Sequence, residues 1–331
     1  MNSFGRLLRV SIFGESHGEC VGITIDGCPA GLSLSPDDLL ADLERRKGGK
    51  QKGTTPRQEE DYPIFKSGVF NGKTTGFPIT ILFDNKNTRS EDYNKQRSIP
   101  RPGHADWTAH QKFGGNEDYR GGGHFSARLT TGIVAAGAIA KKLMQHINIH
   151  AEVTEIGGEK DLEKGLQKAI DAKDSVGGIV ECKVTGMPVG IGEPYFDSVE
   201  SVLSHILFAI PAVRGVEFGT GFAAAKMFGS EHNDAIENMQ GKTQSNHAGG
   251  VVGGISNGNE LVFRLAIKPT SSTPKEQYSL NWDTEQMEHF SVKGRHDLCV
   301  ALRAPVIVEA VTALVLADFM LLEQQIPRII K

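Results

Sequence analysis

Three histidines of the sequence lie in short segments where an imidazole could transfer protons. His17 lies in "GESHG" and His104 in "RPGHAD", and His296 is followed directly by Asp297. Each has a glycine, a proline or a charged residue close by, which is typical of turns. Histidine titrates near neutral pH and is therefore suited to general acid–base catalysis. For each segment alone, the simpler interpretation is a histidine that satisfies loop backbone groups.

The segment "GESHG" also matches the G-x-S-x-G nucleophile elbow of serine hydrolases, which would make Ser16 a nucleophile. Such an elbow lies between a strand and a helix. Residues 7–13 predict the strand. Residues 19–32, however, alternate apolar and polar residues and are rich in glycine, so they predict a second strand and a turn. The sequence therefore disfavours the serine hydrolase, which stays an alternative.

A second group of residues could bind anions. Residues 119–128, "YRGGGHFSAR", place three glycines before a predicted helix that extends to about residue 144, with Arg120 and Arg128 on either side. Backbone N–H groups and the helix dipole at such a position can bind a phosphate or a carboxylate. Close packing of the helix is the other interpretation of the three glycines. The segment matches neither the P-loop nor the dinucleotide-binding fingerprint.

Further basic residues are spread over irregular segments, in a chain whose net charge is −4. They are Arg45, Arg46, Lys50, Lys52, Arg57, Arg101, Lys268, Arg295 and Arg303. This distribution predicts a pocket for a multiply charged small molecule. Residues 268–273, "KPTSST", add four hydroxyl groups that could bind a phosphate or a ribityl chain. An RNA-binding module that uses residues 45–57 is the non-enzymatic alternative, although aromatic residues for base stacking are missing there.

The rest of the composition describes the protein that must position these residues. The chain has 331 residues, of which 39% are hydrophobic and 23% are charged, as in soluble globular proteins. We find no apolar segment of about 20 residues and no signal peptide, so no membrane partner is expected. The acidic net charge argues against general nucleic-acid binding. The four cysteines lack metal-ligand spacing, which predicts a reduced cytoplasmic protein and no metal site.

The hydrophobic patterns predict a mixed α/β chain. Strands are predicted at 7–13, 64–70, 77–84, 177–187 and 260–269, and helices at 37–47, 198–209 and 304–325. The glycine- and alanine-rich helix before residue 144 is expected to pack tightly against a neighbour. No period of 20–50 residues repeats and no Pro/Ser-rich linker occurs, so residues 1–331 are predicted to form a single domain.

Eight segments of the sequence, in order, resemble the chorismate synthase family. They are "FGESHG", "DLERRKGG", "SGVFNGKTTGFPI", "RPGHADWT", "DYRGGGHFSAR", "QSNHAGGVVGGISNG", "KPTSS" and "GRHDLCVALRA". The resemblance implies a β-α-β sandwich, not a Rossmann fold, that forms homotetramers and binds reduced FMN. It also implies a lyase of aromatic amino-acid biosynthesis, in the shikimate pathway. Its reaction converts 5-enolpyruvylshikimate 3-phosphate to chorismate and phosphate by 1,4-anti elimination.

The resemblance also implies roles for individual residues. His17 corresponds to the histidine near the leaving phosphate, His104 to the one that protonates the reduced flavin, and Asp297 to the carboxylate that works with flavin N5 in removing the C6 proton. The implied flavin contacts are His124, Phe125, Ser126, Pro211, Ala212, Gly253, Lys268, Pro269, Thr270, Ser271, Ser272 and Arg295. The implied substrate-binding residues are Arg46, Lys52, Arg120, Arg128 and Arg303.

The chain departs from the family pattern at three places. His124-Phe125-Ser126 replaces a common Arg-Ser-Ser, so backbone contacts are expected at 124 and 125. Lys52 replaces a common arginine and lacks its planar fork. The region 271–294 is shorter than in many relatives, which predicts a trimmed loop. The missing dinucleotide fingerprint favours an external flavin reductant, and reduction of its own flavin with NADPH is the open alternative.

Overall fold

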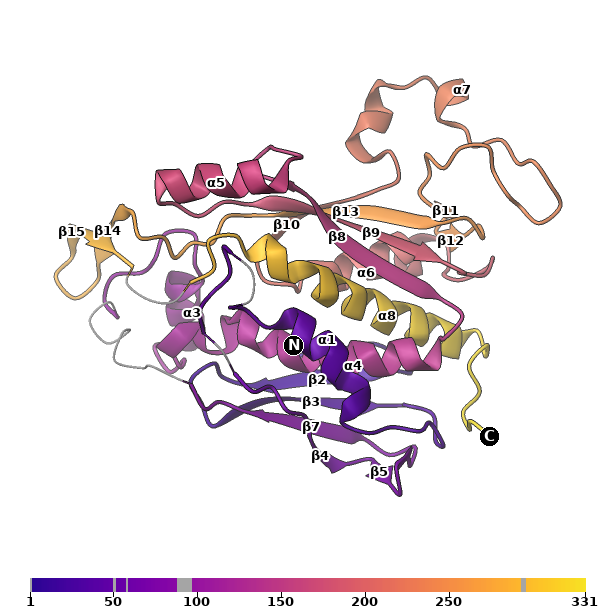
Figure 1. The fold of residues 1–331 in the computed structure, drawn as a ribbon, viewed down its shortest axis with the longest axis horizontal. Helices are drawn as coiled ribbons and strands as arrows, with labels where there is room; N and C mark the ends of the chain where they lie inside the picture. The colour runs from indigo at the N-terminus through magenta and orange to yellow at the C-terminus, as the bar shows by residue number, and fades with distance from the viewer. Residues whose placement is uncertain (1, 50–51, 58, 88–96, 293–295) are drawn as a thin grey trace.

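Two antiparallel sheets lie on opposite sides of a pair of long helices in a computed structural model of the chain (Figure 1). The structure describes residues 2–49, 52–57, 59–87, 97–292 and 296–331. The first sheet has the order β1-β2-β3-β7-β4, with β1 Ser3–Phe4, β2 Arg9–Gly14, β3 Cys20–Asp26, β7 Ile79–Asp84 and β4 Ile64–Ser67. The second has the order β10-β13-β9-β8, with β10 Val213–Phe218, β13 Leu261–Ile267, β9 Gly178–Thr185 and β8 Asn148–Ile156. The mixed α/β prediction is confirmed.

The strands form where apolar residues alternate along the chain. β13 buries every second side chain, as expected when successive side chains point to opposite faces of a sheet. In the first sheet Ile23 pairs with Ile81, and both are fully buried. The strand predicted at 64–70 is interrupted at Gly68, because its φ is +80° and a Cβ atom there would lie 2.6 Å from Cα of Ile79. β5 (Val69–Phe70) instead forms a small ladder with β6 (Lys73–Thr74).

The helices α4 (Thr130–Leu143) and α8 (Ala304–Leu322) form the layer between the sheets. They approach closely, because a Cβ atom on Gly137 of α4 would lie 2.3 Å from Cβ of Ala310 of α8. The predicted tight packing of the small-residue helix is therefore confirmed. The expectation that no apolar segment of about 20 residues occurs is wrong, because Val300–Leu322 is long and apolar enough to cross a membrane. Of its 18-residue apolar window, however, 83% is buried inside the protein. Such all-round burial is typical of a helix in an inner layer.

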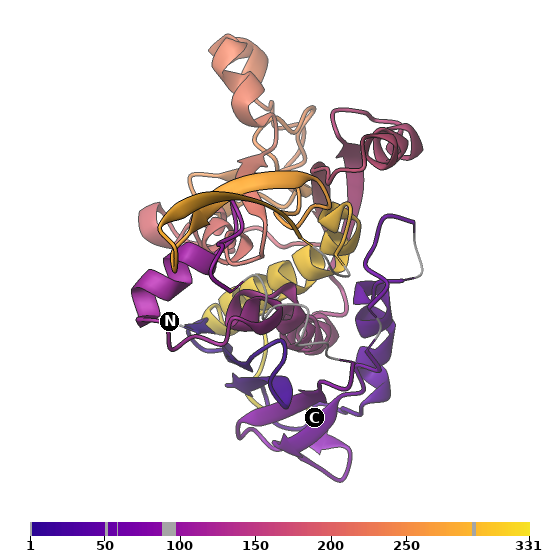
Figure 2. The same ribbon diagram turned by 90° about the vertical axis from the view of Figure 1, so that its left-hand side faces the viewer.

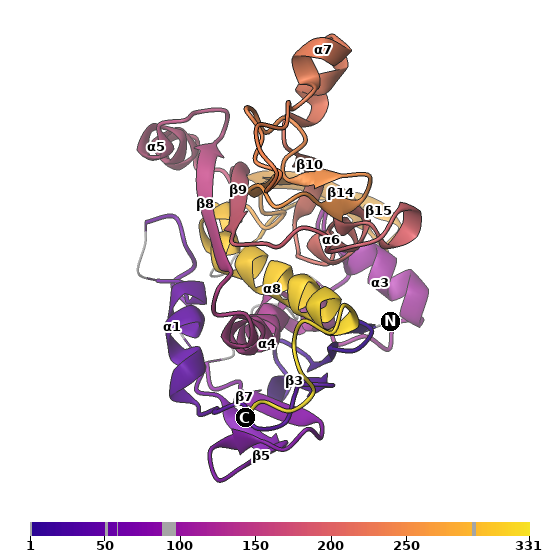
Figure 3. The same ribbon diagram turned by 90° about the vertical axis from the view of Figure 1, so that its right-hand side faces the viewer.

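The remaining elements surround this layer. They are the helices α1 Asp37–Arg46, α3 Asp106–Phe113, α5 Leu162–Ala172, α6 Val199–Leu207 and α7 Gly229–His232, and the paired strands β11 Val251–Val252 with β12 Ile255–Ser256 and β14 Glu276–Asn281 with β15 Gln286–Ser291. Figures 2 and 3 show that α7 lies at the end of a projecting arm. The sequence analysis missed α3. It also expected a trimmed loop where the hairpin β14–β15 forms.

Candidate active site

A cavity of about 550 Å³ lies where the loops of the protein meet the beginnings of α4 and α8. Its described lining is strongly basic. The cations are Arg46, Lys47, Arg57, Arg101, Arg128, Arg214, Lys268 and Arg303, and the carboxylates are Glu59, Asp61 and Asp297. The excess of cations makes the cavity suitable for a ligand with several negative charges.

Both central helices direct their N-terminal ends at this cavity. Arg128 lies in a short 3-10 helix (η2, Ala127–Leu129) directly before α4, and Arg303 ends another (η5, Val300–Arg303) directly before α8. The N-terminal end of a helix carries a partial positive charge and favours anions. The partial positive charges of two helix ends and the charges of two arginines therefore lie close together at the cavity.

His17 and Ser16 lie in the turn between β2 and β3, on one side of the cavity. Because a strand follows the turn, the strand–helix geometry of a hydrolase elbow is absent, and the serine hydrolase interpretation is wrong. Ser16 is fully buried, and its hydroxyl accepts a hydrogen bond from Nη1 of Arg57 at 3.1 Å. In the part of the chain that the structure describes, the hydroxyl of Ser16 is thus hydrogen-bonded to a cation and not to a general base.

The surroundings of His17 favour the neutral imidazole. Its side chain is 9% exposed, and burial lowers its pKa. The positive charges of Arg57 and Arg120 lower the pKa further, while Asp118 opposes them. The three glycines make room for this ring, because a Cβ atom on Gly121 would lie 2.6 Å from Cε1 of His17. Close packing is therefore the role that the structure gives to Gly121.

His104 lies in the loop before α3 and is fixed by charged neighbours. Its Nδ1 lies 2.5 Å from Oδ1 of Asp106, and Arg101 contacts both residues. Burial alone would raise the pKa of Asp106, but the hydrogen bonds from Arg101 and His104 lower it far more. Asp106 therefore stays ionised and orients the imidazole.

The segment after β13 is tied to the same loop. Nζ of Lys268 donates to the carbonyl of Gly103 and, at 3.0 Å, to the hydroxyl of Ser271. Arg101 donates to the hydroxyl of Ser272 at 3.0 Å. The predicted residues of "KPTSS" and His104 are thus brought together on the cavity surface.

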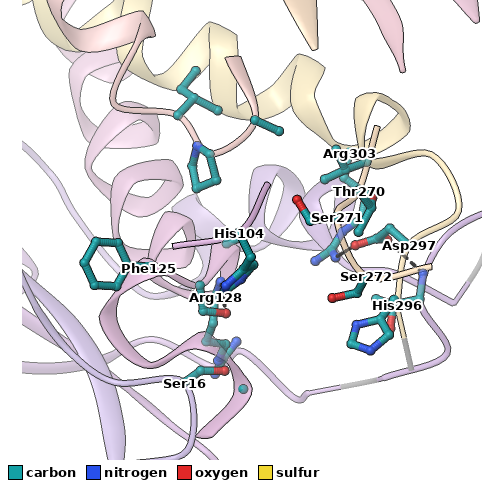
Figure 4. A pocket seen from close by; sticks show the side chains of 18 of the residues that line it. Ser16, His104, Phe125, Arg128, Thr270, Ser271, Ser272, His296, Asp297 and Arg303 are labelled. Atoms are coloured by element: carbon teal, nitrogen blue, oxygen red, sulfur yellow. Dashed lines mark hydrogen bonds and ion pairs between the residues drawn. The ribbon is translucent and has the colours of Figure 1, made fainter. Parts of the chain in front are cut away.

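Asp297 lies across the cavity from His104 and Arg128 in the view of Figure 4. Its carboxylate accepts from the backbone N–H of Thr55 at 2.8 Å and from Nη1 of Arg303 at 3.0 Å. Nε of Arg303 also donates to the carbonyl of Arg46 at 3.0 Å. These bonds connect the segment before α8 with the end of α1.

Most of the sequence-predicted residues line this one cavity. They are His17, His104, Asp297, Arg46, Arg128, Arg303, Phe125, Ser126, Pro211, Ala212, Lys268, Pro269, Thr270, Ser271 and Ser272. Four others do not. Lys52 donates to Gln167, Arg120 pairs with Asp118, His124 contacts the carbonyl of Gly14, and Gly253 lies between β11 and β12. Arg295 lies outside the described residues.

Sequence reasoning gave no role to four charged residues of the cavity: Lys47, Glu59, Asp61 and Arg214. Nη2 of Arg57 pairs with Glu59 at 2.7 Å, and Asp61 contacts Arg46 and Arg128. The spacing of these charges was no usable signal, because a period of two places side chains on one side only in an extended segment, and Asp61 has a φ of +51°. The basic segment 45–57 gives no support to RNA binding, since Arg45 and Arg46 both pair with buried carboxylates.

Comparison with known proteins finds similarity along nearly the whole length of the chain. The sequence model of the chorismate synthase family matches residues 8–321. The chorismate synthase of Chitinophaga pinensis is 66% identical over 332 residues, with 100% of both chains covered. That of Dehalococcoides mccartyi is 45% identical over 361 residues, covering 100% of this chain and 99% of the relative. That of Methanocaldococcus jannaschii is 42% identical and covers 97% and 96% of the two chains.

A solved structure shows the same fold. The structure titled "Crystal Structure of Chorismate Synthase" matches with a TM-score of 0.73 and 26% sequence identity. The match covers 97% of this chain and 93% of that one. The similarity therefore extends over both sheets and the helices between them.

Proposed function

The chain belongs to the chorismate synthase family, and from this premise we propose how its cavity binds the ligands and handles the protons of the reaction. It is a lyase that converts 5-enolpyruvylshikimate 3-phosphate to chorismate and phosphate, in the biosynthesis of aromatic amino acids. The family uses reduced flavin. One observation carries the proposal: His17, His104, Asp297 and three arginines line a single cavity at two helix N-termini.

The cavity fits reduced FMN by size and by donor chemistry. A volume of about 550 Å³ lies within the range of ligand pockets. The hydroxyl of Thr270 is buried and has no hydrogen-bond partner among the described residues, and a ligand with hydroxyl or phosphate groups would supply one. Lys268 and residues 269–272 would hold the polar parts of the flavin, with Phe125, Ser126, Pro211 and Ala212 against its ring. When bound, reduced FMN supplies electron density to the substrate.

The arginines would bind the anionic groups of the substrate. Arg46, Arg128 and Arg303 lie around the beginnings of α4 and α8, where the helix dipoles favour negative charge. The substrate carries a phosphate and two carboxylates. Charge-assisted hydrogen bonds from guanidinium groups match these anions.

The two histidines and the aspartate would handle protons. His17 is kept near its neutral form and would act beside the leaving phosphate. His104, oriented by Asp106, would hold a proton next to the flavin site. The carboxylate of Asp297, held by Thr55 and Arg303, would assist removal of the hydrogen from C6 of the substrate.

Several further expectations remain part of the proposal. The layered sheets and helices support a β-α-β sandwich and not a Rossmann fold, since every described ladder is antiparallel. We propose a cytoplasmic homotetramer that depends on an external flavin reductant and uses neither nucleic acid nor membrane. Lys52, Arg120, His124, Gly253 and Arg295 are retained as proposed contacts. The first four would need a movement of their segments or a second copy of the chain.

Anaerobic turnover tests the proposal most directly. Purified protein, dithionite-reduced FMN and 5-enolpyruvylshikimate 3-phosphate should give chorismate and phosphate, and binding of FMN should tighten when substrate is present. Chorismate formed at the full rate with oxidised FMN and no reductant would contradict the proposal.

A further inference from the structure

Asp61 is a buried carboxylate between two of the proposed substrate arginines. Its Oδ2 accepts from Nη2 of Arg46 at 2.7 Å, and its Oδ1 accepts from Nη1 of Arg128. The side chain of Asp61 is 1% exposed, and those of Arg46 and Arg128 are each 4% exposed. One carboxylate therefore fixes two guanidinium groups that have almost no contact with bulk water.

The backbone at Asp61 supports a specific role for this residue. Its φ is +51°, in the left-handed region that side-chain-bearing residues adopt infrequently. Aspartate tolerates this region better than most residues, and its short side chain brings the carboxylate between the two arginines. Unfavourable backbone conformations of this kind persist where the surrounding structure imposes them, often at functional sites.

The hydrogen-bonding groups of Arg46 and Arg128 are satisfied to different extents. Among the described residues, Nε of Arg46 is a buried donor without a hydrogen-bond partner, although Arg46 lines the cavity. Arg128 is held more completely, by Asp61, the side chain of Asn85 and the carbonyl of Asp84. A buried donor without a partner is unfavourable, so an anion next to Arg46 would be stabilised.

The charges of Asp61, Arg46 and Arg128 also favour binding of an anion. Asp61 neutralises one of the two positive charges, and the remaining charge faces the cavity. Burial lowers the pKa of Arg46 to about 10, with Asp61 acting in the opposite direction. Without Asp61, two buried guanidinium groups would repel each other and turn away from their present positions.

We propose that Asp61 is a positioning residue that holds Arg46 and Arg128 in the geometry that binds the anionic groups of the substrate. This inference rests on the proposed function, because it takes both arginines to be substrate-binding residues. Asp61 acts through them and does not contact the substrate.

The test compares Asp61→Asn with Glu60→Gln, which makes the same chemical change at the neighbouring position. Glu60 is a suitable control because its side chain is 66% exposed and pairs with Lys86, which is 63% exposed. Asp61→Asn should raise KM for 5-enolpyruvylshikimate 3-phosphate about 10- to 150-fold, the equivalent of one lost charge-assisted hydrogen bond. The value of kcat at saturating substrate should change by less than about threefold, because the proton-handling groups stay in place. Glu60→Gln should match the parent.

Either of two results would overturn the inference: a substrate KM of Asp61→Asn equal to that of the parent, or a loss of kcat at unchanged KM. Arg46→Met and Arg128→Met separate this inference from the proposed function. If these two variants bind substrate like the parent, the assignment of the arginines fails. If they bind weakly and Asp61→Asn does not, only the role of Asp61 fails.

A second variant covers the case in which Asp61→Asn does not fold. Asp61→Asn combined with Arg46→Met leaves a single buried guanidinium, that of Arg128, without its carboxylate. Its KM should exceed that of Arg46→Met alone at least threefold, because Arg128 is no longer held. Equal values for the two variants would overturn the inference. Glu60→Gln combined with Arg46→Met serves as the matched control.

Discussion

Two neighbouring arginines at the end of α1 reach two different buried carboxylates, and the two clusters differ in what their cations face. Arg45 makes two hydrogen bonds of 2.7 Å to Glu309 of α8, which also accepts from Lys141 at 2.8 Å. Arg46 pairs instead with Asp61, which also holds Arg128. Glu309 and Asp61 each bind two cations, but Asp42 also pairs with both Arg45 and Lys141.

The exposure of the cations separates the two clusters. The side chains of Arg45 and Lys141 are 45% and 25% exposed, so water solvates these charges. Those of Arg46 and Arg128 are buried, and both residues line the cavity. Burial would raise the pKa of Glu309, but the hydrogen bond from Arg45 and the charge of Lys141 lower it. A buried ion-pair cluster alone is therefore no sign of a binding site. A cluster indicates a binding site when its cations also line a cavity and one of their donors lacks a partner among the described residues.

The largest effect on activity is expected when a proton-handling residue of the cavity, Asp297, is changed. Asp297→Asn should lower kcat about 10²- to 10⁴-fold, the usual contribution of a general acid or base. The deuterium isotope effect at C6 should rise, because proton removal then limits the rate. Anaerobic kinetics with protiated and C6-deuterated substrate measure both quantities. An unchanged rate and isotope effect would remove Asp297 from the chemistry.

A smaller difference is expected when the two buried carboxylates themselves are changed. Asp61→Asn leaves two buried cations unpaired and should lower the free energy of unfolding by about 3–5 kcal/mol. Glu309→Gln leaves cations that reach water and should lower it by about 1.5–3 kcal/mol. Urea unfolding of both variants measures these values.

The substrate KM also distinguishes Asp61→Asn from Glu309→Gln. It should stay unchanged in Glu309→Gln, whose cluster does not line the cavity, and should rise in Asp61→Asn. An equal loss of stability in the two variants, or a raised KM in Glu309→Gln, would show that the clusters do not differ in the proposed way.

A shift of a pKa is the next effect in size. Arg57 is the charged group that lowers the pKa of His17 most, acting with Arg120 and against Asp118. Arg57→Gln removes a positive charge beside the imidazole, so protonation becomes easier and the pKa of His17 should rise. NMR titration of the His17 ring measures the shift. Arg214→Gln removes another cavity cation and should leave this pKa where it is, and an unchanged pKa in Arg57→Gln would contradict the assignment.

The sequence predicted the regular elements better than the contacts between them. β13 and α8 were predicted because alternation and a mostly apolar run are local patterns. The helix α3 and the hairpin β14–β15 were missed, since short polar segments carry little periodicity and are stabilised by tertiary contacts. Trp282 in the hairpin turn, for example, stacks on His110 of α3 at a ring-centroid distance of 4.6 Å.

The site shows the same limit. His17, His104 and Asp297 were singled out by residue type and by family resemblance, and they line one cavity. Asp61 was not, because its role depends on two arginines that lie 15 and 67 residues away in the sequence. A pairing over such separations leaves no local pattern, and only the folded chain brings the three side chains together.

The smallest effect is expected at Ser16, a buried polar residue that lines the cavity. Its hydroxyl accepts a hydrogen bond from Arg57, and no general base among the described residues bonds to it. When this hydrogen bond is lost, Arg57 keeps its ion pair with Glu59, so Ser16→Ala should keep activity within about tenfold. No covalent intermediate is proposed, and so no nucleophile is lost. Turnover of Ser16→Ala beside His17→Ala, with FMN binding measured in both, tests the distinction. If Ser16→Ala is folded, binds FMN and is still as inactive as His17→Ala, the proposed distinction between Ser16 and His17 is wrong.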